Sequence, residues 1–577
     1  MSNVKLKPSE EKIWLKHVTD DYLSDPIPKC TALEYLKKAS SERLHHYSIN
    51  YYGNKVTYAD MFRHIDTCAN AFYALGVREG DIVSFLTSTI PECIYSLYAI
   101  NKLGATANTI DPRMDTAAIA RMIKGSGSKI LVVVDVAFFK IADCIEDLGQ
   151  DKIVVQSATT SLDLIKTIAI KLKVKTNIKY SDKVIRWKTF ISGGKGVNAP
   201  TAPYVGDRTV CITYTGGTTG VPKGVMLTND SVNAVSYNFK YAMPYYEPRD
   251  RFLGIIPVFT SYGFVCGLHM PLCLGAEFIP IPKFNPYEFG KLVKKYRPNH
   301  MISTPAFYEM LMDSKEVKAL DLSFLTTLGS GGDTMNEGLE TRLGEFMKEH
   351  NIKYPLAQGY GLSEMSAAAS FCVNDKYRRG SVGIPSVTTI ISAFDPETGE
   401  ELDYNQNGEI CVTGPSMMKG YFNNPEETAN VMRTHSDGTV WIHTGDLGYI
   451  DEDGFLFIIG RIKRMITRFD GHKVFPLTIE NMVSERNEVR NCCVVGVDDR
   501  ERSQGQYPMV LVELNDGLDK AAVCKAIYED CNARCEERGR PVAVVALESI
   551  PLTNMGKNDY RTLEKQYKAY DYVSKPY

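Results

Sequence analysis

The chain has 577 residues, of which 44% are hydrophobic and 23% charged, with 66 basic and 69 acidic side chains and a formal net charge of −3. This length exceeds what one hydrophobic core supports, so we expect at least two domains. The balanced charge argues against a nucleic-acid-binding surface. The fourteen scattered cysteines lack the spacing of a zinc site, which favours reduced thiols in a cytoplasmic protein.

The N-terminal half has the pattern of an α/β lobe. Residues 1–21 are charged and lack the apolar core of a secretory signal. The most apolar run, Ile130 to Phe139, contains Asp135 and is too short to be an integral membrane segment. From Thr31 to Gly104 helix and strand patterns alternate, which favours a largely parallel sheet covered on both faces.

A less regular region follows, with one basic stretch. From Lys166 to Lys175, apolar residues and lysines alternate, which is the period of a β-strand with one basic face. Such a strand could touch an anionic membrane surface, but basic side chains also commonly protect exposed sheet edges. We therefore predict a solvent-exposed edge strand here.

The stretch from Tyr214 to Gly224 has the composition of a phosphate-binding loop. Its glycines let backbone N–H groups approach phosphate, its threonine hydroxyls add donors, and Lys223 adds positive charge. A kinase-type P-loop is excluded because Pro222, which has no N–H, precedes the lysine. Residues 329–332 are not a dinucleotide fingerprint either, since position 334 is threonine.

Three later stretches carry residues suited to a nucleotide. Gly331 and Gly332 leave a predicted strand, and loops at strand ends bind ligands in α/β sheets. In Ala357 to Glu364, the aromatic face of Tyr360 suits a purine, and the carboxylate of Glu364 beside a phosphate loop calls for a bridging hard cation. Asp446 follows a Thr-Gly pair, and a carboxylate suits the ribose diol.

These stretches resemble, in order, the signatures of the adenylate-forming superfamily, which includes acyl-CoA synthetases, firefly luciferase and peptide-synthetase adenylation domains. A last signature around Lys557 extends the resemblance over nearly the whole chain. It implies an α/β fold with a large multi-sheet N-terminal domain, residues 1–460. It also implies a small mobile α+β C-terminal domain, residues 461–577, with Lys463 as the hinge.

The resemblance also implies residue roles. Lys557, Lys223 and Glu364 would be catalytic, and Glu364 would be the Mg²⁺ ligand. The expected ATP site consists of Thr215, Gly216, Gly217, Thr218, Thr219, Gly220, Lys223, Gly331, Gly332, Tyr360, Gly361, Ser363, Asp446, Arg461 and Lys557. The expected acyl pocket includes Thr260, Tyr262 and Gly263, and the expected CoA face includes Gly471 and His472.

Four positions depart from the superfamily pattern. Gly216 stands where many members carry serine, and Thr260 where acyl-CoA synthetases often have histidine. Arg464 replaces the acidic residue that commonly follows the hinge. The chain also has one extra residue around Phe469 to Gly471, in the part that helps to form the thiol-acceptor face in the family.

We therefore expect ATP-dependent activation of a small-molecule carboxylic acid, with fatty acids among the candidates, followed by transfer to CoA. Two alternatives remain. The acceptor could be the thiol of a separate carrier protein, or the chain could be a nucleotide-binding pseudo-enzyme. The presence of Lys557, Glu364, Asp446 and Arg461 together argues against the second alternative.

Overall fold

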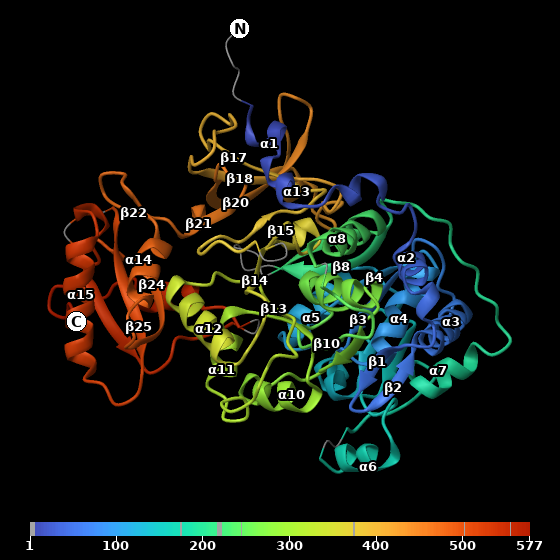
Figure 1. Ribbon diagram of the computed structural model, residues 1–577. Coiled ribbons are helices and arrows are strands. Elements are labelled where there is room, and N and C mark those ends of the chain that lie inside the picture. The colour runs from blue at the N-terminus through green and yellow to red at the C-terminus, as the bar shows by residue number, and fades with distance from the viewer. Residues whose placement is uncertain are drawn as a thin grey trace, which may run out of the picture.

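The computed structural model describes residues 6–173, 176–215, 222–243, 245–372, 376–500, 502, 504–553 and 556–577. It confirms the predicted α/β class, with a large N-terminal part and a smaller C-terminal part at one side (Figure 1). Two large sheets, of seven and nine strands, form most of the N-terminal part. Within the described ranges, no helix combines the length and apolar character that a bilayer crossing requires.

The seven-stranded sheet is parallel except for its last pair. Its order is β7-β6-β5-β3-β4-β8-β9, and only β8 and β9 pair antiparallel. The bounds are β3 (Ile82–Leu86), β4 (Thr106–Thr109), β5 (Ile130–Val134), β6 (Lys152–Gln156), β7 (Val184–Arg186), β8 (Thr209–Thr215) and β9 (Lys223–Thr228). Every residue of β5 is buried, as expected for an apolar strand covered on both faces.

The nine-stranded sheet has the order β16-β15-β14-β13-β12-β10-β11-β1-β2. Its strands are β1 (Tyr47–Tyr51), β2 (Asn54–Thr57), β10 (Arg251–Gly254), β11 (Glu277–Pro280), β12 (His300–Ser303), β13 (Thr327–Ser330), β14 (Ala357–Tyr360), β15 (Ser370–Phe371) and β16 (Ile384–Pro385). Because β12, β13 and β14 pair in parallel, their carboxyl ends meet at one edge of the sheet.

Helices cover these sheets. The N-terminal part contains α1 (Pro8–Glu11), α2 (Ala32–Ala39), α3 (Tyr58–Ala74), α4 (Pro91–Lys102), α5 (Thr116–Gly125), α6 (Leu164–Lys173), α7 (Trp187–Gly193), α8 (Asn229–Ala242), α9 (Met270–Cys273), α10 (Phe289–Tyr296), α11 (Pro305–Met312), α12 (Glu337–Glu349) and α13 (Pro425–Val431). Side-chain oxygens cap several of them as the sequence suggests; for example, the Thr228 side chain accepts from the Ser231 N–H at the start of α8.

The edge strand predicted over Lys166 to Lys175 is wrong for residues 166–173, which belong to helix α6; residues 174 and 175 lie outside the described residues. The Asp163 side chain accepts a hydrogen bond from the Lys166 N–H at 2.9 Å, which is a helix N-cap contact. The apolar residues Leu164, Ile165 and Ile168 also fit the three-to-four-residue spacing of a helix. The alternation of apolar residues and lysines over a few positions fits both a strand and a helix. The hydrogen bond to the Asp163 side chain is the contact that marks the start of the helix.

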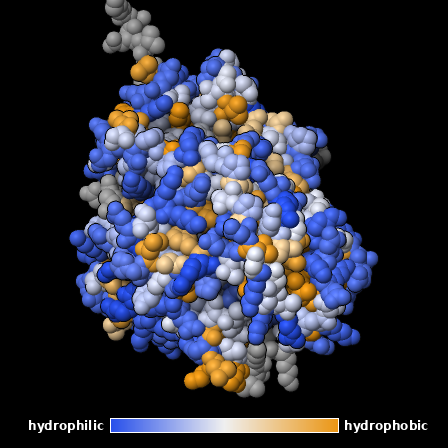
Figure 2. Space-filling view, turned by 90° about the vertical axis from the view of Figure 1, so that its right-hand side faces the viewer, coloured by the Kyte–Doolittle hydropathy of each residue, from blue (hydrophilic) through white to orange (hydrophobic). Residues whose placement is uncertain are grey.

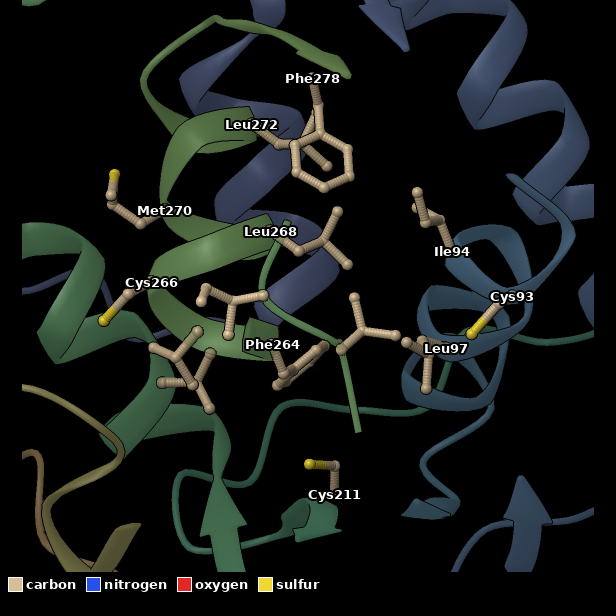
Figure 3. Packing of buried hydrophobic residues seen from close by; sticks show 14 of the residues in the cluster. Cys93, Ile94, Leu97, Cys211, Phe264, Cys266, Leu268, Met270, Leu272 and Phe278 are labelled. Carbon is tan, nitrogen blue, oxygen red and sulfur yellow. The ribbon is translucent and has the colours of Figure 1, made fainter. Parts of the chain in front are cut away.

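The apolar stretch after Ser261 connects the two sheets. Tyr262–His269 is a π-helical segment, η6, which α9 continues. Its residues Phe264 and Leu268 point toward Ile94 and Leu97 of α4, whereas Cys266 lies on the opposite side (Figure 3). The segment therefore packs one face toward α4, which covers the seven-stranded sheet, and Phe278 of β11 in the nine-stranded sheet lies on this same side (Figure 3).

A third, antiparallel sheet and the C-terminal part complete the fold. The third sheet contains β17 (Ile390–Phe394), β18 (Gly408–Thr413), β19 (Met432–Thr434), β20 (Val440–Ile450) and β21 (Leu456–Arg461). The C-terminal part contains β22 (Ile466–Thr467), β23 (Lys473–Val474), β24 (Val489–Asp498), β25 (Gln506–Leu514), β26 (Ala543–Leu547), α14 (Pro476–Ser484), α15 (Lys520–Arg534) and α16 (Tyr560–Tyr567). Two separate hydrophobic clusters form its core.

The two parts meet where α12 packs against α14. A Cβ atom at Gly338 of α12 would lie 1.8 Å from the carbonyl oxygen of Ser484 at the end of α14. Only glycine therefore permits this close approach. The Ser484 hydroxyl also accepts a hydrogen bond from the Gly338 N–H at 3.2 Å, which fixes the contact.

The cysteines form no bonds with one another in the structure. All fourteen are free thiols, and only Cys144 and Cys535 are partly exposed, the others being buried. The structure thus contains no disulfide.

Candidate active site

A cavity of about 430 Å³ opens at the carboxyl ends of β8, β12, β13 and β14 and is closed on one side by the C-terminal part. Residues from β8, β14, β20 and β21 and from the loop after Gly556 line it together. We call this cavity the cleft. Strand ends and a domain boundary are where α/β proteins place ligand sites.

One corner of the cleft contains a hydrogen-bonded network around the buried Asp446. The Tyr360 hydroxyl donates to Asp446 Oδ2 at 2.7 Å, and Arg461 Nε donates to Oδ1 at 2.9 Å. The Asp446 side chain is only 5% exposed. The carboxylate raises the pKa of Arg461, and burial followed by this same carboxylate raises the pKa of Tyr360. The arrangement places a carboxylate beside an aromatic ring.

The strand pairing explains why these residues meet. Asp446 and Arg461 are paired residues of the β20–β21 hairpin, and Tyr360 ends β14. The turn before Asp446 is held by Glu409, whose carboxylate accepts from the Gly445 N–H at 3.1 Å and lies 2.9 Å from His443 Nδ1. Burial acts to raise the pKa of Glu409, but these hydrogen bonds outweigh it and lower the pKa.

A second corner contains Lys223 and Glu364. Lys223 forms an ion pair with Glu427 and lies 5.1 Å from the ring centre of Tyr421. The Tyr421 hydroxyl donates to Glu364 Oε1 at 2.6 Å. Lys223 pairs with Thr215 across β8 and β9, so both residues flank the stretch 216–221, which lies outside the described residues.

The C-terminal part contributes Lys557. A tight loop bridges Leu552 to Asn558, with the Thr553 N–H donating to the Lys557 carbonyl at 2.7 Å. The Asn558 amide anchors the loop by donating to the Cys492 carbonyl at 3.3 Å. Lys557 lines the cleft, where desolvation lowers its pKa although the Asp333 and Asp446 carboxylates oppose this effect.

The predicted hinge lies at the edge of the cleft. Lys463 belongs to the short helix η9 (Ile462–Arg464) and lines the cleft. The neighbouring Arg464, which departs from the superfamily pattern, donates to Glu480 of α14 at 2.7 Å. Burial acts to lower the pKa of Arg464, but the Glu480 carboxylate outweighs it and raises the pKa. The substitution is thus compensated inside the C-terminal part.

The remaining end of the cleft is mostly apolar. Its described lining residues carry no charge; they are Phe239, Ala242, Met243, Ile256, Cys266, Ile302, Thr327, Phe371 and Cys372. Thr260 and Tyr262 also line the cleft, and a Cβ atom at Gly331 would lie 3.3 Å from the Tyr262 hydroxyl oxygen. This end can accommodate an uncharged group.

The structure brings together most of the predicted site residues. Those that line the cleft are Thr215, Lys223, Thr260, Tyr262, Gly331, Gly332, Tyr360, Gly361, Ser363, Glu364, Asp446, Arg461, Lys463 and Lys557. Gly263 does not line it; a Cβ there would lie 1.9 Å from the Pro257 carbonyl oxygen, so this glycine serves the packing of η6. Gly471 and His472 do not line it either.

The predicted phosphate-loop residues Gly216, Gly217, Thr218, Thr219 and Gly220 lie outside the described residues. Sequence reasoning missed Tyr421, Glu427 and Glu409 as members of the site. Tyr421 and Glu427 meet their partners across 57 and 204 positions, respectively, and no local pattern marks them. Glu409 belongs to β18, which pairs with β20, the strand that carries the Thr-Gly-Asp turn. This pairing is visible only in the structure.

Two family models match the chain. The model described as "AMP-binding enzyme" covers residues 36–422, and the model described as "AMP-binding enzyme C-terminal domain" covers residues 478–557. The first range includes Lys223, Tyr360, Glu364 and Tyr421, and the second includes Lys557; Glu427 and the β20–β21 hairpin lie between the two ranges.

Curated relatives match nearly the full length. A long-chain-fatty-acid–CoA ligase of Bacillus subtilis (strain 168) is 30% identical over 567 residues, which are 95% of this chain and 96% of that protein. 4-Coumarate-CoA ligase 1 of Narcissus pseudonarcissus is 30% identical over 527 residues, 89% of each chain.

Solved structures share the fold. An anthranilate CoA ligase, AuaEII, in complex with anthranoyl-AMP has a TM-score of 0.80 at 20% identity and covers 94% of this chain and 98% of its own. ATP-bound MatB from Rhodopseudomonas palustris has a TM-score of 0.77 at 23% identity, with 93% and 99% covered. The cleft, the family models and the full-length relatives agree, and the chain belongs to the family of AMP-binding enzymes.

Proposed function

We propose that the protein joins a carboxylic acid to ATP, giving an acyl adenylate and pyrophosphate, and then transfers the acyl group to the thiol of CoA. The observation that carries this proposal is the position of Lys557, a cation from the C-terminal part that enters a cleft containing Asp446, Tyr360 and Glu364. The relatives named as CoA ligases support the second step.

The residues of the cleft fit ATP and Mg²⁺. Tyr360 offers an aromatic ring beside the Asp446 carboxylate, which can accept from ribose hydroxyls with its remaining lone pairs. Glu364 offers a hard oxygen ligand near Lys223, and Mg²⁺ in proteins is commonly held by one or two carboxylates together with substrate phosphates. When bound, the ion would neutralise charge on the phosphate oxygens.

In the first step an anionic carboxylate approaches an anionic phosphate. Two like charges about 4 Å apart repel by about 4 kcal/mol at an effective dielectric of about 20. Lys557 would bind both anions and offset this repulsion, whereas Lys223 would hold the departing pyrophosphate. No nucleophilic side chain is required.

In the second step we propose that the C-terminal part, residues 461–577, rotates about Lys463 against residues 1–460. Gly471 and His472 are placed away from the cleft in this structure, and the rotation would exchange them for Lys557. One cleft would then serve two reactions through a domain movement. A cytoplasmic location fits the fourteen free thiols.

We propose that the acid has an uncharged tail. The lining residues at the apolar end of the cleft, among them Phe239 and Phe371, include no described charged side chain that could pair with an amino group or a second carboxylate. Fatty and aryl acids, which the names of the relatives mention, have this property. Amino acids and dicarboxylic acids do not.

Neutralising Glu427 should strengthen ATP binding. Glu427 holds Lys223 in an ion pair that bound phosphates must replace. We expect Glu427→Gln to lower KM for ATP about two- to fivefold, since partly exposed ion pairs contribute up to about 1 kcal/mol. The measurement is initial-rate kinetics of pyrophosphate release. Glu426→Gln, in the same helix, is the matched control and should leave KM unchanged; an increased KM in Glu427→Gln would contradict the role.

As pH rises, the rate of acyl adenylate formation should fall at a pH below the ordinary pKa of a lysine side chain. Desolvation lowers the pKa of Lys557, so its positive charge is present below that pKa and is lost as pH rises through it. Lys557→Arg should be less active but should lose this alkaline limb, because a guanidinium stays charged up to about pH 12. The pH profile of acyl adenylate formation measures this. An unchanged alkaline limb in Lys557→Arg would assign it to another group.

The experiment that tests the function is acid-dependent pyrophosphate release with ATP and Mg²⁺, measured with and without CoA. The acids should include short, medium and long fatty acids, aryl acids and amino acids. Continued turnover that needs one acid class and CoA would support the ligase. A single burst that CoA does not extend would favour a carrier-protein thiol, and ATP binding without release for every acid would favour a pseudo-enzyme.

A further inference from the structure

Helix α6 exposes a group of large apolar side chains. The exposed fractions of Leu164, Ile165 and Ile168 are 74%, 81% and 51%. In Figure 1 the helix stands apart at the lower edge of the molecule, connected by loops on both sides. Figure 2 shows hydrophobic residues gathered at the same lower end. Such a group on an otherwise polar surface costs solvation free energy and marks an interaction site.

The same segment is basic. Residues 161–179 contain five lysines and one aspartate, so their formal charge is +4 in a chain whose net charge is −3. The single aspartate, Asp163, is used internally, because it caps α6 and pairs with Lys166. The apolar side chains therefore lie in a strongly positive segment without an unpaired carboxylate.

We propose that α6 docks the protein on a membrane surface rich in anionic phospholipids. Leu164, Ile165 and Ile168 would enter the boundary between headgroups and acyl chains, and the formal positive charge of the segment would favour anionic headgroups. Lysines near such a surface strengthen binding electrostatically, and burial of the apolar side chains adds to this. The helix would lie in the plane of the interface and would not cross it.

The charge favours this surface over a second copy of the chain. A symmetric dimer formed through α6 would bring two segments of formal charge +4 together, and like charges at close distance repel. An anionic bilayer complements both the charge and the apolar side chains. The proposal does not depend on which reaction the cleft performs.

The test is sedimentation of the full-length protein with phosphatidylcholine vesicles that contain about half phosphatidylglycerol, compared with pure phosphatidylcholine vesicles. We expect the wild type to bind the anionic vesicles at least about tenfold more tightly than the neutral ones. Binding should weaken as salt rises from roughly 50 mM to roughly 500 mM. Ile165→Asp and Ile168→Asp should each lower the partition coefficient at least about tenfold.

Tyr287→Asp is the matched control, because Tyr287 is 79% exposed and belongs to another part of the N-terminal domain. It should bind vesicles like the wild type, and all variants should keep the wild-type melting temperature because these side chains are exposed. Absence of wild-type binding to anionic vesicles would overturn the proposal, as would equal binding of Ile165→Asp. A wild-type dimer that Ile165→Asp dissociates, without vesicle binding, would assign α6 to a second copy instead.

Discussion

Replacing Lys557 with alanine is expected to lower the rate of acyl adenylate formation about a thousandfold while leaving thioester formation from a supplied acyl adenylate within about twofold of the wild type. The factor follows from the repulsion of about 4 kcal/mol that Lys557 would offset, since about 1.4 kcal/mol corresponds to a factor of ten in rate. The measurements are pyrophosphate release for the first step and CoA consumption with a synthetic acyl adenylate for the second.

Lys565→Ala is the control for this prediction, because Lys565 is an exposed lysine of α16 in the same C-terminal part. It should leave both steps unchanged. The informative result is the difference between the two steps in Lys557→Ala, with adenylate formation slowed and thioester formation retained. If Lys557→Ala slows both steps equally, Lys557 does not leave the cleft between them, and the proposed rotation about Lys463 is contradicted.

Replacing Asp446 with asparagine is expected to raise KM for ATP about a hundredfold. The carboxylate is buried and accepts from both Tyr360 and Arg461, whereas an amide offers one acceptor and leaves the Arg461 guanidinium without its counter-ion. Each hydrogen bond to a charged group contributes about 1.5 to 3 kcal/mol, and loss of one to two of them gives this factor. The ATP dependence of pyrophosphate release is the measurement.

The control is Asp453→Asn, the same change in the turn of the same β20–β21 hairpin. Asp453 is 52% exposed, pairs with Lys16 and Arg378 at the surface, and does not line the cleft. Its KM for ATP should equal that of the wild type. A wild-type KM in Asp446→Asn would show that the network around Asp446 only supports the fold.

The sequence predicted the parallel sheets and the corners of the cleft because both depend on local patterns. Runs such as Ile130 to Val134 are apolar throughout and became buried strands. Signatures such as Thr-Gly-Asp at Asp446 keep their chemistry within a few residues. Lys557 is different, since by itself it resembles a surface lysine, and only the family pattern indicated its place.

Contacts between distant segments could not be predicted. Lys223 meets Glu427 across 204 positions, and Glu364 meets Tyr421 across 57; nothing near either residue indicates its partner. Helix α6 shows a second reason why prediction from the sequence failed. The alternation after Lys166 fitted a strand, and the decisive contact was a single hydrogen bond to the Asp163 side chain.

The distribution of the thiols makes the protein suitable for fluorescence labelling without engineering. Among fourteen cysteines, only Cys144 and Cys535 are partly exposed, and they lie on opposite sides of Lys463, the hinge that we propose. Burial raises the pKa of both thiols, so mildly alkaline conditions would promote their reaction with maleimide dyes. Energy transfer between dyes at the two positions would then test the proposed domain rotation in the unmodified sequence, as acid, ATP and CoA are added in turn.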